Sequence, residues 1–434
     1  MLVYFVIVLI YFLVKILKEK DKFVWALIGS SYFTGVEVFL RMTKASPSWE
    51  TGKYVVIFFS LVGISMVGFK KNAAPYVIYF LLLLPGVLVA YDLLAFDVNF
   101  RNSILFNLTG PICLSIASVF AFGRSIRLSD LLKVLDYMVY PIITTTVYII
   151  LHQPTEQEIF ISTASNPAAS GGFSGNQVAT ILGLGFFILL TRFFIPYKNV
   201  LVHWTMMFFM ALMLYRALLT FSRGGVVASV IIGIAFIGIY YLKVTSKTKI
   251  IRKLIILLLG GMLLWGYSEL QTGGLITNRY TNRDALGREK EDITTGRGTL
   301  AMAEIQAFKD NPVFGLGVGR VSEYFEDELS IDLPTHNEIS RLFSEHGLFG
   351  ILALLTLIFA PIITKLQGRK NIYFWSFFLF CFLTMGHSSM RVAAPAFIYA
   401  LCLLNVDYAS EKKVVVRRKR IDRVVDKNLL EAKV

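Results

Sequence analysis

Three short polar motifs carry arginines and a histidine in an otherwise apolar chain. They are Phe-Ser-Arg-Gly-Gly at 221–225, Thr-Gly-Arg-Gly at 295–298 and Thr-His-Asn-Glu at 335–338. The guanidinium groups of Arg223 and Arg297 suit two-pronged hydrogen bonds to phosphate oxygens. The imidazole of His336 suits proton transfer near neutral pH. The motifs therefore predict a site that holds an anionic group beside a proton acceptor.

Four more polar residues are predicted to bind the same ligand. Arg216 stands seven residues before Arg223 in an apolar run, which we interpret as two turns deeper on the same helix face. A charge at membrane depth costs at least about 2.5–3.5 kcal/mol and normally faces a cavity or a partner. Ser222 suits a turn where the backbone approaches a ligand, and Arg320 and Asn337 extend the polar set.

Each motif also has a simpler explanation that the sequence leaves open. An arginine at the end of a membrane helix commonly reaches the lipid headgroups, Gly-Arg-Gly is a short pattern, and a lone histidine at a helix start is commonly solvated. The other histidines suit proton transfer less well. His346 is expected at the membrane interface, and the remaining three are expected to pack in or beside apolar helices, namely His152, His203 and His387.

The composition predicts that membrane helices position these motifs. Of 434 residues, 56% are hydrophobic and only 17% are charged, which excludes a water-soluble globule. A bilayer-spanning helix needs about 20 apolar residues. We expect an all-α polytopic bundle of about thirteen helices, with a first helix that is retained, from apolar runs at 2–18, 23–40, 54–69, 75–95, 104–123, 129–151, 176–194, 200–220, 225–242, 249–267, 347–364, 371–388 and 392–406.

The distribution of Lys and Arg predicts the orientation of the bundle. Basic residues cluster in every second loop and in the tail, where nine Lys or Arg follow residue 410. Cytoplasmic loops are enriched in these residues. The C-terminus is therefore expected in the cytoplasm, the N-terminus outside, and all three motifs on the outer face. The net charge of +14 is explained by this topology and by attraction to anionic lipids, so a nucleic-acid partner is not expected.

The same pattern divides the chain into four parts. We expect transmembrane helices at 1–267, a large periplasmic loop with the motifs at 268–346, further transmembrane helices at 347–408 and a basic cytoplasmic tail at 409–434. Inside the loop, apolar spacing predicts a helix at 299–309 closed by Asn311-Pro312. A glycine-rich turn at 315–320 follows. Thr335 and Glu338 match a capping box, which places His336 in the first helical turn.

Neither a metal nor a cofactor is expected. The three cysteines lie within apolar runs and form no Cys-x-x-Cys pair. The acidic stretch at 324–332 holds no Asp-x-Asp pair, the arrangement that would bind a divalent cation beside a nucleotide sugar.

Taken in order, the motifs resemble the O-antigen ligase and polymerase superfamily of bacterial membrane enzymes over residues 205–360. The resemblance implies that Arg223, Arg297 and His336 are the functional residues. It also implies an inner-membrane enzyme with a periplasmic active site and a glycan donor on undecaprenyl diphosphate. The family commonly has about twelve helices and a cytoplasmic N-terminus, whereas the charge pattern here predicts thirteen and an outer N-terminus.

The resemblance implies a metal-independent transfer in which the arginines hold the diphosphate while His336 takes a proton from the acceptor hydroxyl. The acceptor is expected to be the lipid A core, which makes the protein an O-antigen ligase. A growing glycan chain, as in a polymerase, and a protein, as in an O-oligosaccharyltransferase, remain alternatives. A transporter of lipid-linked oligosaccharides is a more distant alternative, because such proteins tend to have repeated halves with charges at the bilayer midplane. A structural scaffold would have no reason to gather Arg and His on one face.

Overall fold

The computed structural model describes residues 2–93, 100–152, 162–292, 294, 296–329, 337–388 and 390–408. Helices dominate this part of the chain. They are α1 (Leu2–Lys18), α2 (Lys22–Met42), α3 (Thr51–Val67), α4 (Ala74–Leu93), α5 (Phe100–Ala121), α6 (Leu128–Leu151), α8 (Gly175–Phe194), α9 (Val200–Leu219), α10 (Arg223–Lys243), α11 (Lys247–Gln271), α12 (Leu275–Tyr280), α13 (Arg297–Asp310), α14 (Val321–Leu329), α15 (Glu338–Leu366), α16 (Phe374–Ser388) and α17 (Ala394–Cys402). Two 3₁₀ turns, Lys71–Ala73 and Ala168–Ser170, and two strands, β1 (Ser125–Arg127) and β2 (Asn405–Asp407), complete the described elements.

The predicted all-α membrane fold is confirmed. Nine helices of the described residues are long and apolar enough to cross a bilayer, and α3 and α16 are shorter apolar helices. In the described residues, every apolar run expected from the sequence overlaps a helix. The last run differs in extent: α17 has 9 residues and rises only about 14 Å at 1.5 Å per residue, too little to cross a bilayer alone.

Burial separates central helices from lipid-facing ones. In the most apolar 18-residue stretch of α2 and of α8, 89% of the residues are buried, whereas in that of α11 only 6% are buried. Met262 and Leu263 on α11 are 68% and 75% exposed. Hydrocarbon tails solvate such side chains as well as a protein core does. The bundle is therefore centred on α2 and α8, with α11 at its edge.

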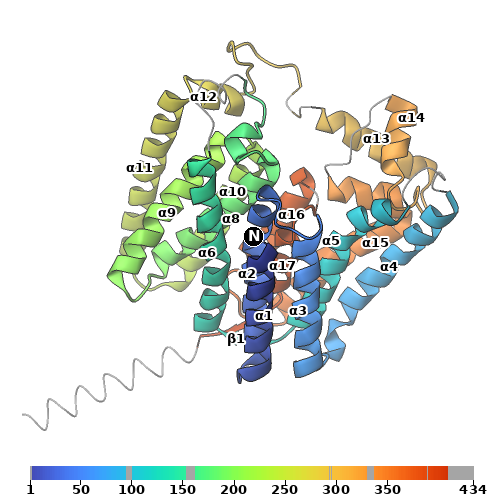
Figure 1. Ribbon diagram of the computed structural model, residues 1–434, viewed down its shortest axis with the longest axis horizontal. Coiled ribbons are helices and arrows are strands. Elements are labelled where there is room, and N and C mark those ends of the chain that lie inside the picture. The colour runs from blue at the N-terminus through green and yellow to red at the C-terminus, as the bar shows by residue number, and fades with distance from the viewer. Residues whose placement is uncertain are drawn as a thin grey trace, which may run out of the picture.

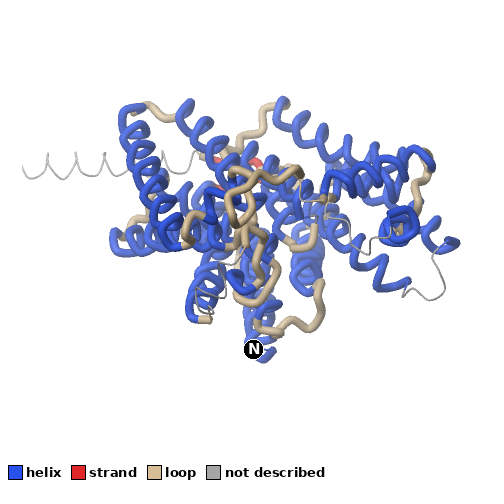
Figure 2. Tube along the Cα trace, turned by 90° about the horizontal axis from the view of Figure 1, so that it is seen from above, coloured by secondary structure: helices blue, strands red, loops and turns tan. Residues whose placement is uncertain are grey.

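The two ends of the bundle differ. The short strands β1 and β2 pair in parallel, with Ser125 opposite Asn405, at the end opposite α12, α13 and α14 (Figure 1). Seen from above, the helices lie on either side of a central region where loops gather (Figure 2). The helices of the large polar loop are thus collected at one end.

Charged side chains inside the bundle hold the connection between α16 and α17. Lys53 donates to the carbonyl of residue 390 at 3.2 Å, Arg41 to that of residue 391 at 3.0 Å, and Glu37 accepts from the N–H of residue 393 at 2.7 Å. Arg41 and Glu37 also form an ion pair at 2.5 Å. Irregular backbone at membrane depth requires such partners. These bonds fix the end of α16 relative to α2 and α3.

Candidate active site

A tight turn between α9 and α10 presents the first arginine motif. Phe221 adopts a left-handed backbone with φ of 54°, and Ser222 is the N-cap of α10, which begins at Arg223. The Ser222 hydroxyl donates to Asn176 Oδ1 on α8 at 2.8 Å. The turn is therefore anchored to a central helix, and Arg223 stands at the start of α10.

Because of this turn, the expectation that Arg216 and Arg223 share one helix face is wrong. The chain reverses between them, so the two residues lie on α9 and α10 and not on one helix face. Arg216 is buried and donates through Nη2 to Ala169 O at 3.2 Å. It therefore holds the 3₁₀ turn at Ala168–Ser170 against α9.

Arg279 on α12 joins the site, although its sequence context did not single it out. Its Nε donates to Phe221 O at 2.8 Å, which ties α12 to the α9–α10 turn. Burial, followed by the positive charges of Arg223 and Arg297, lowers the pKa of Arg279 to about 10. Three guanidinium groups from three separate segments thus lie within electrostatic reach of one another.

The second predicted motif begins α13. Gly296 is the N-cap with φ of 81°, a left-handed conformation that glycine accepts without strain. Arg297 is the first helical residue, and its Nη1 donates to His387 O at 3.1 Å. Burial and then the charge of Arg223 lower the pKa of Arg297. This contact docks the loop helix α13 on the end of α16.

His387 packs and forms hydrogen bonds in the bundle, as expected, and its backbone carbonyl also accepts from Arg297. Its Nδ1 lies 2.8 Å from Leu383 O and its Nε2 lies 3.3 Å from Thr180 Oγ1. Because a carbonyl oxygen only accepts, Nδ1 carries a proton. The ring packs on Gly224, where an added Cβ would lie 2.4 Å from His387 Cδ2. The glycine after Arg223 thus allows α10 to approach α16.

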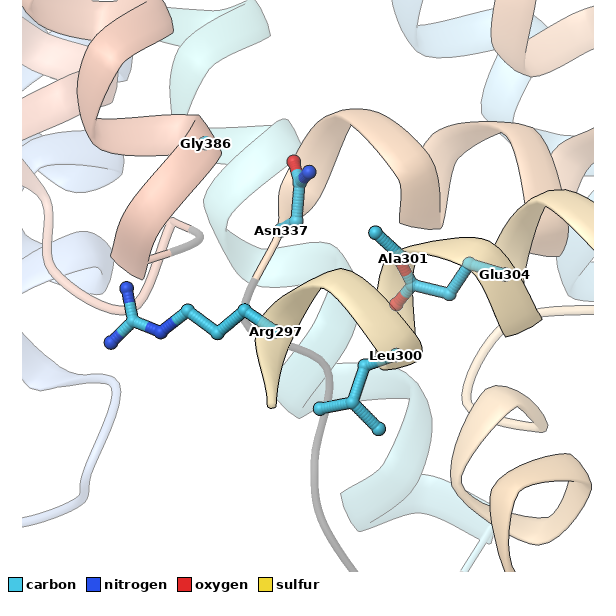
Figure 3. Close-up of a pocket in the computed structure, with 6 residues that line it drawn as sticks. All are labelled: Arg297, Leu300, Ala301, Glu304, Asn337 and Gly386. Carbon is cyan, nitrogen blue, oxygen red and sulfur yellow. The ribbon is translucent and has the colours of Figure 1, made fainter. Parts of the chain in front are cut away.

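A small cavity lies beside Arg297. It measures about 40 Å³, room for a few water molecules or one hydroxyl group, and its polar lining residues are Arg297, Glu304 and Asn337. Figure 3 shows Arg297 extending from the start of α13 away from Glu304. Glu304 is 1% exposed and accepts a hydrogen bond from Ser340. Arg297 and Asn337, both predicted site residues, therefore share one cavity.

The structure corrects the expected start of α15. Asn337 is the N-cap, and its Oδ1 accepts from Ile339 N at 3.0 Å. The predicted cap at Thr335 is therefore two residues too early. Thr335 and His336 lie outside the described residues, and the role predicted for His336 stays a prediction.

Arg320 and His346 are turned to other partners. Arg320 Nε forms an ion pair with Glu323 Oε2 at 3.0 Å at the start of α14. His346 is only 3% exposed and packs on α4, where a Cβ on Gly86 would lie 2.4 Å from its Nδ1. It is thus buried in a helix contact, and neither residue joins the arginine cluster.

Metal ligands do not gather in the described part of the chain, where no group of three or more His, Cys, Asp or Glu is placed to hold an ion. Within the same residues, no carboxylate forms an ion pair with Arg279 or Arg297. The site as described is an arginine cluster with a neighbouring buried carboxylate and histidine. An arrangement of this kind favours an anionic ligand.

The comparisons with known proteins agree with the motifs. Residues 208–355 match the family described as O-antigen ligase, a stretch that holds all the predicted site residues and Arg279 but not His387. The resemblance drawn from the motifs is thereby confirmed, and the match implies a glycosyltransferase of the O-antigen ligase or polymerase type. A search of curated proteins found no match.

Proposed function

Because residues 208–355 match the O-antigen ligase family, we propose that this protein transfers a glycan from undecaprenyl diphosphate to an acceptor hydroxyl. The transfer takes place at the periplasmic face of the bacterial inner membrane, and the acceptor is the lipid A core. No metal takes part. Arg223 and Arg297 hold the diphosphate, and His336 receives the acceptor's proton.

The feature that carries this proposal is the meeting of arginines from separate segments. Arg279 donates to Phe221 O at 2.8 Å, in the turn just before Arg223, and Arg297 donates to His387 O at 3.1 Å. The charges of Arg223 and Arg297 act on Arg279, and that of Arg223 acts on Arg297. Bringing three like charges together in a partly buried site costs free energy. A bound diphosphate would offset that cost, because guanidinium groups bind phosphate oxygens through charge-assisted hydrogen bonds.

The proposed reaction needs no nucleotide. The acceptor oxygen forms a bond to the anomeric carbon as the bond from that carbon to the diphosphate oxygen breaks, and the acceptor proton passes to the His336 imidazole. Negative charge grows on the departing undecaprenyl diphosphate. Fixed positive groups at that position stabilise the transition state more than the ground state.

The neighbouring residues have supporting roles in this proposal. His387 positions Arg297 through its carbonyl oxygen, at 3.1 Å from Nη1. Ser222 fixes the turn that presents Arg223, and Arg216 supports the adjoining loop. Asn337 lines the cavity next to Arg297 and contacts the acceptor.

Transfer assays on reconstituted protein test this assignment. His336→Ala should lower turnover about 10²- to 10⁴-fold, the usual contribution of a general base, and leave diphosphate binding intact. Arg297→Ala should weaken both binding and turnover. Arg283→Ala is the matched control, because Arg283 is an exposed arginine of the same loop. Near-normal turnover of correctly inserted His336→Ala and Arg297→Ala variants would reject the proposed roles.

The acceptor is identified by deletion in the native bacterium and gel analysis of the surface polysaccharide. Loss of glycan-capped lipopolysaccharide with accumulation of lipid-linked chains supports ligation. A single repeat left on the lipid A core instead indicates a polymerase. Loss of glycan from proteins alone indicates a protein O-oligosaccharyltransferase.

A further inference from the structure

Three cations gather around Gly123 at the β1 end of the bundle, opposite the arginine site (Figure 1). Lys70 Nζ donates to Gly123 O at 2.8 Å. A Cβ on Gly123 would lie 2.9 Å from Arg369 Nη2. Arg124 is the next residue, and its Nε donates to Phe120 O at 2.7 Å. The connections α3–α4, α5–β1 and α15–α16 each contribute one of these charges.

In the described part of the chain, backbone carbonyl groups accept the hydrogen bonds of these three cations. Arg369 Nη1 donates to Leu403 O at 3.2 Å, and Arg124 also donates to Gly68 O. Among the residues that the structure describes, no carboxylate forms an ion pair with any of the three. Burial, and then the charges of Arg124 and Arg369, lower the pKa of Lys70. The cluster is therefore a positive region that a bound anion would stabilise.

An apolar groove adjoins the cluster. A cavity of about 470 Å³ lies between the ends of α4, α5 and α15, with Pro75, Phe122 and Ile363 in its wall and Arg369 at its polar edge. The Arg369 guanidinium stacks on Phe122, with 4.2 Å between Cζ and the ring centroid. Ile363 is 51% exposed, so the wall continues onto the lipid-facing surface. The groove thus combines a cationic end with an apolar side.

We propose that this groove is a binding site for an anionic phospholipid, with the headgroup phosphate at Lys70, Arg124 and Arg369 and an acyl chain along α15. The charge pattern of the sequence assigns this end to the cytoplasmic side. Basic pockets between membrane helices on that side are suited to anionic headgroups. A soluble phosphate would use the cations alone, whereas a phospholipid also covers the apolar wall.

The test measures lipid binding to the full-length protein in phosphatidylcholine nanodiscs or detergent by native mass spectrometry. Phosphatidylglycerol is the probe and phosphatidylcholine the comparison. We expect preferential retention of phosphatidylglycerol, and about fivefold weaker binding to Arg369→Gln, the loss expected for one basic residue at a membrane surface. Lys198→Gln, at an exposed lysine of the α8–α9 connection, is the matched control and should bind as the unmodified protein does.

A second variant covers the case in which Arg369→Gln fails to fold without its bond to Leu403 O. Ile363→Trp fills the apolar wall and leaves every charge in place, so it should also weaken phosphatidylglycerol binding. Equal binding of the two lipids would overturn the proposal, as would an equal loss in Lys198→Gln. Displacement of phosphatidylglycerol by inorganic phosphate alone, or recovery of a polyprenyl phosphate from the groove, would also overturn it.

Discussion

Replacing Arg279 tests whether it acts together with the other two arginines or is close to them only by chance. The side chain has two functions in the structure. It donates to Phe221 O at 2.8 Å, and its charge is coupled to those of Arg223 and Arg297. Arg279→Ala removes both functions, whereas Arg279→Lys keeps the charge and loses the fork-shaped donor.

The expected effect follows from one charge-assisted hydrogen bond to the ligand. Such bonds contribute about 1.5–3 kcal/mol, and about 1.4 kcal/mol corresponds to a factor of ten. Arg279→Ala should therefore lower kcat/KM for the diphosphate-linked donor about 10- to 100-fold. Arg279→Lys should recover part of that loss.

A thermal-shift measurement with pyrophosphate provides a second readout that does not depend on turnover. Pyrophosphate should raise the Tm of the unmodified protein, because it relieves repulsion among the three arginines. The rise should be smaller in Arg279→Ala and unchanged in Arg283→Ala. A folded Arg279→Ala variant with normal kcat/KM and a normal pyrophosphate shift would refute the reasoning.

Three other predictions follow from the same structure. Pyrophosphate affinity should fall as pH rises through about 10, because the lowered pKa makes Arg279 lose its positive charge there. An unchanged affinity across this pH range in titration calorimetry would contradict this prediction. Gly224→Ala should destabilise the protein by about 1–3 kcal/mol, because the new Cβ would lie 2.4 Å from His387 Cδ2 and overpack the contact between α10 and α16. An unchanged free energy of unfolding would show that this contact is not tightly packed. Lys53→Met should destabilise the protein by about 3–5 kcal/mol by leaving buried Glu50 without its ion-pair partner, and the double change with Glu50→Gln should recover much of the loss in unfolding assays. Equal stability of the single and double variants would oppose this account.

Part of the candidate site was predictable because it depends on residues that are close together in the sequence. Arg297 follows a glycine that accepts a left-handed backbone, and the apolar spacing after it gives α13, which ends at Asp310 with Asn311 as its C-cap, one residue beyond the expected end. Arg223 directly follows an apolar run and begins α10. Both positions depend on neighbours within a few residues. The cap of α15 was misplaced because Thr335 and Asn337 are both good N-cap residues, and the capping box with Glu338 favoured Thr335.

Arg279 and His387 were not predicted because their roles depend on distant parts of the chain. Arg279 is one of several arginines in a polar loop, and only the contact with Phe221 distinguishes it. His387 ends an apolar helix, which is typical of a packing residue. Its place beside Arg297 requires α13, α10 and the end of α16 to meet.

The membrane class, the helical fold and the polar motifs can be read from the chain alone, because hydrophobic length and local backbone preference act over a few turns of chain. Which charges act together depends on the folded arrangement. Electrostatic coupling depends on separation in space, and α10, α12 and α13 meet through contacts between residues as far apart as Phe221 and Arg279. The buried bonds of Lys53 and Arg41 to the α16–α17 connection likewise join residues more than 300 positions apart, a pairing that no local pattern encodes.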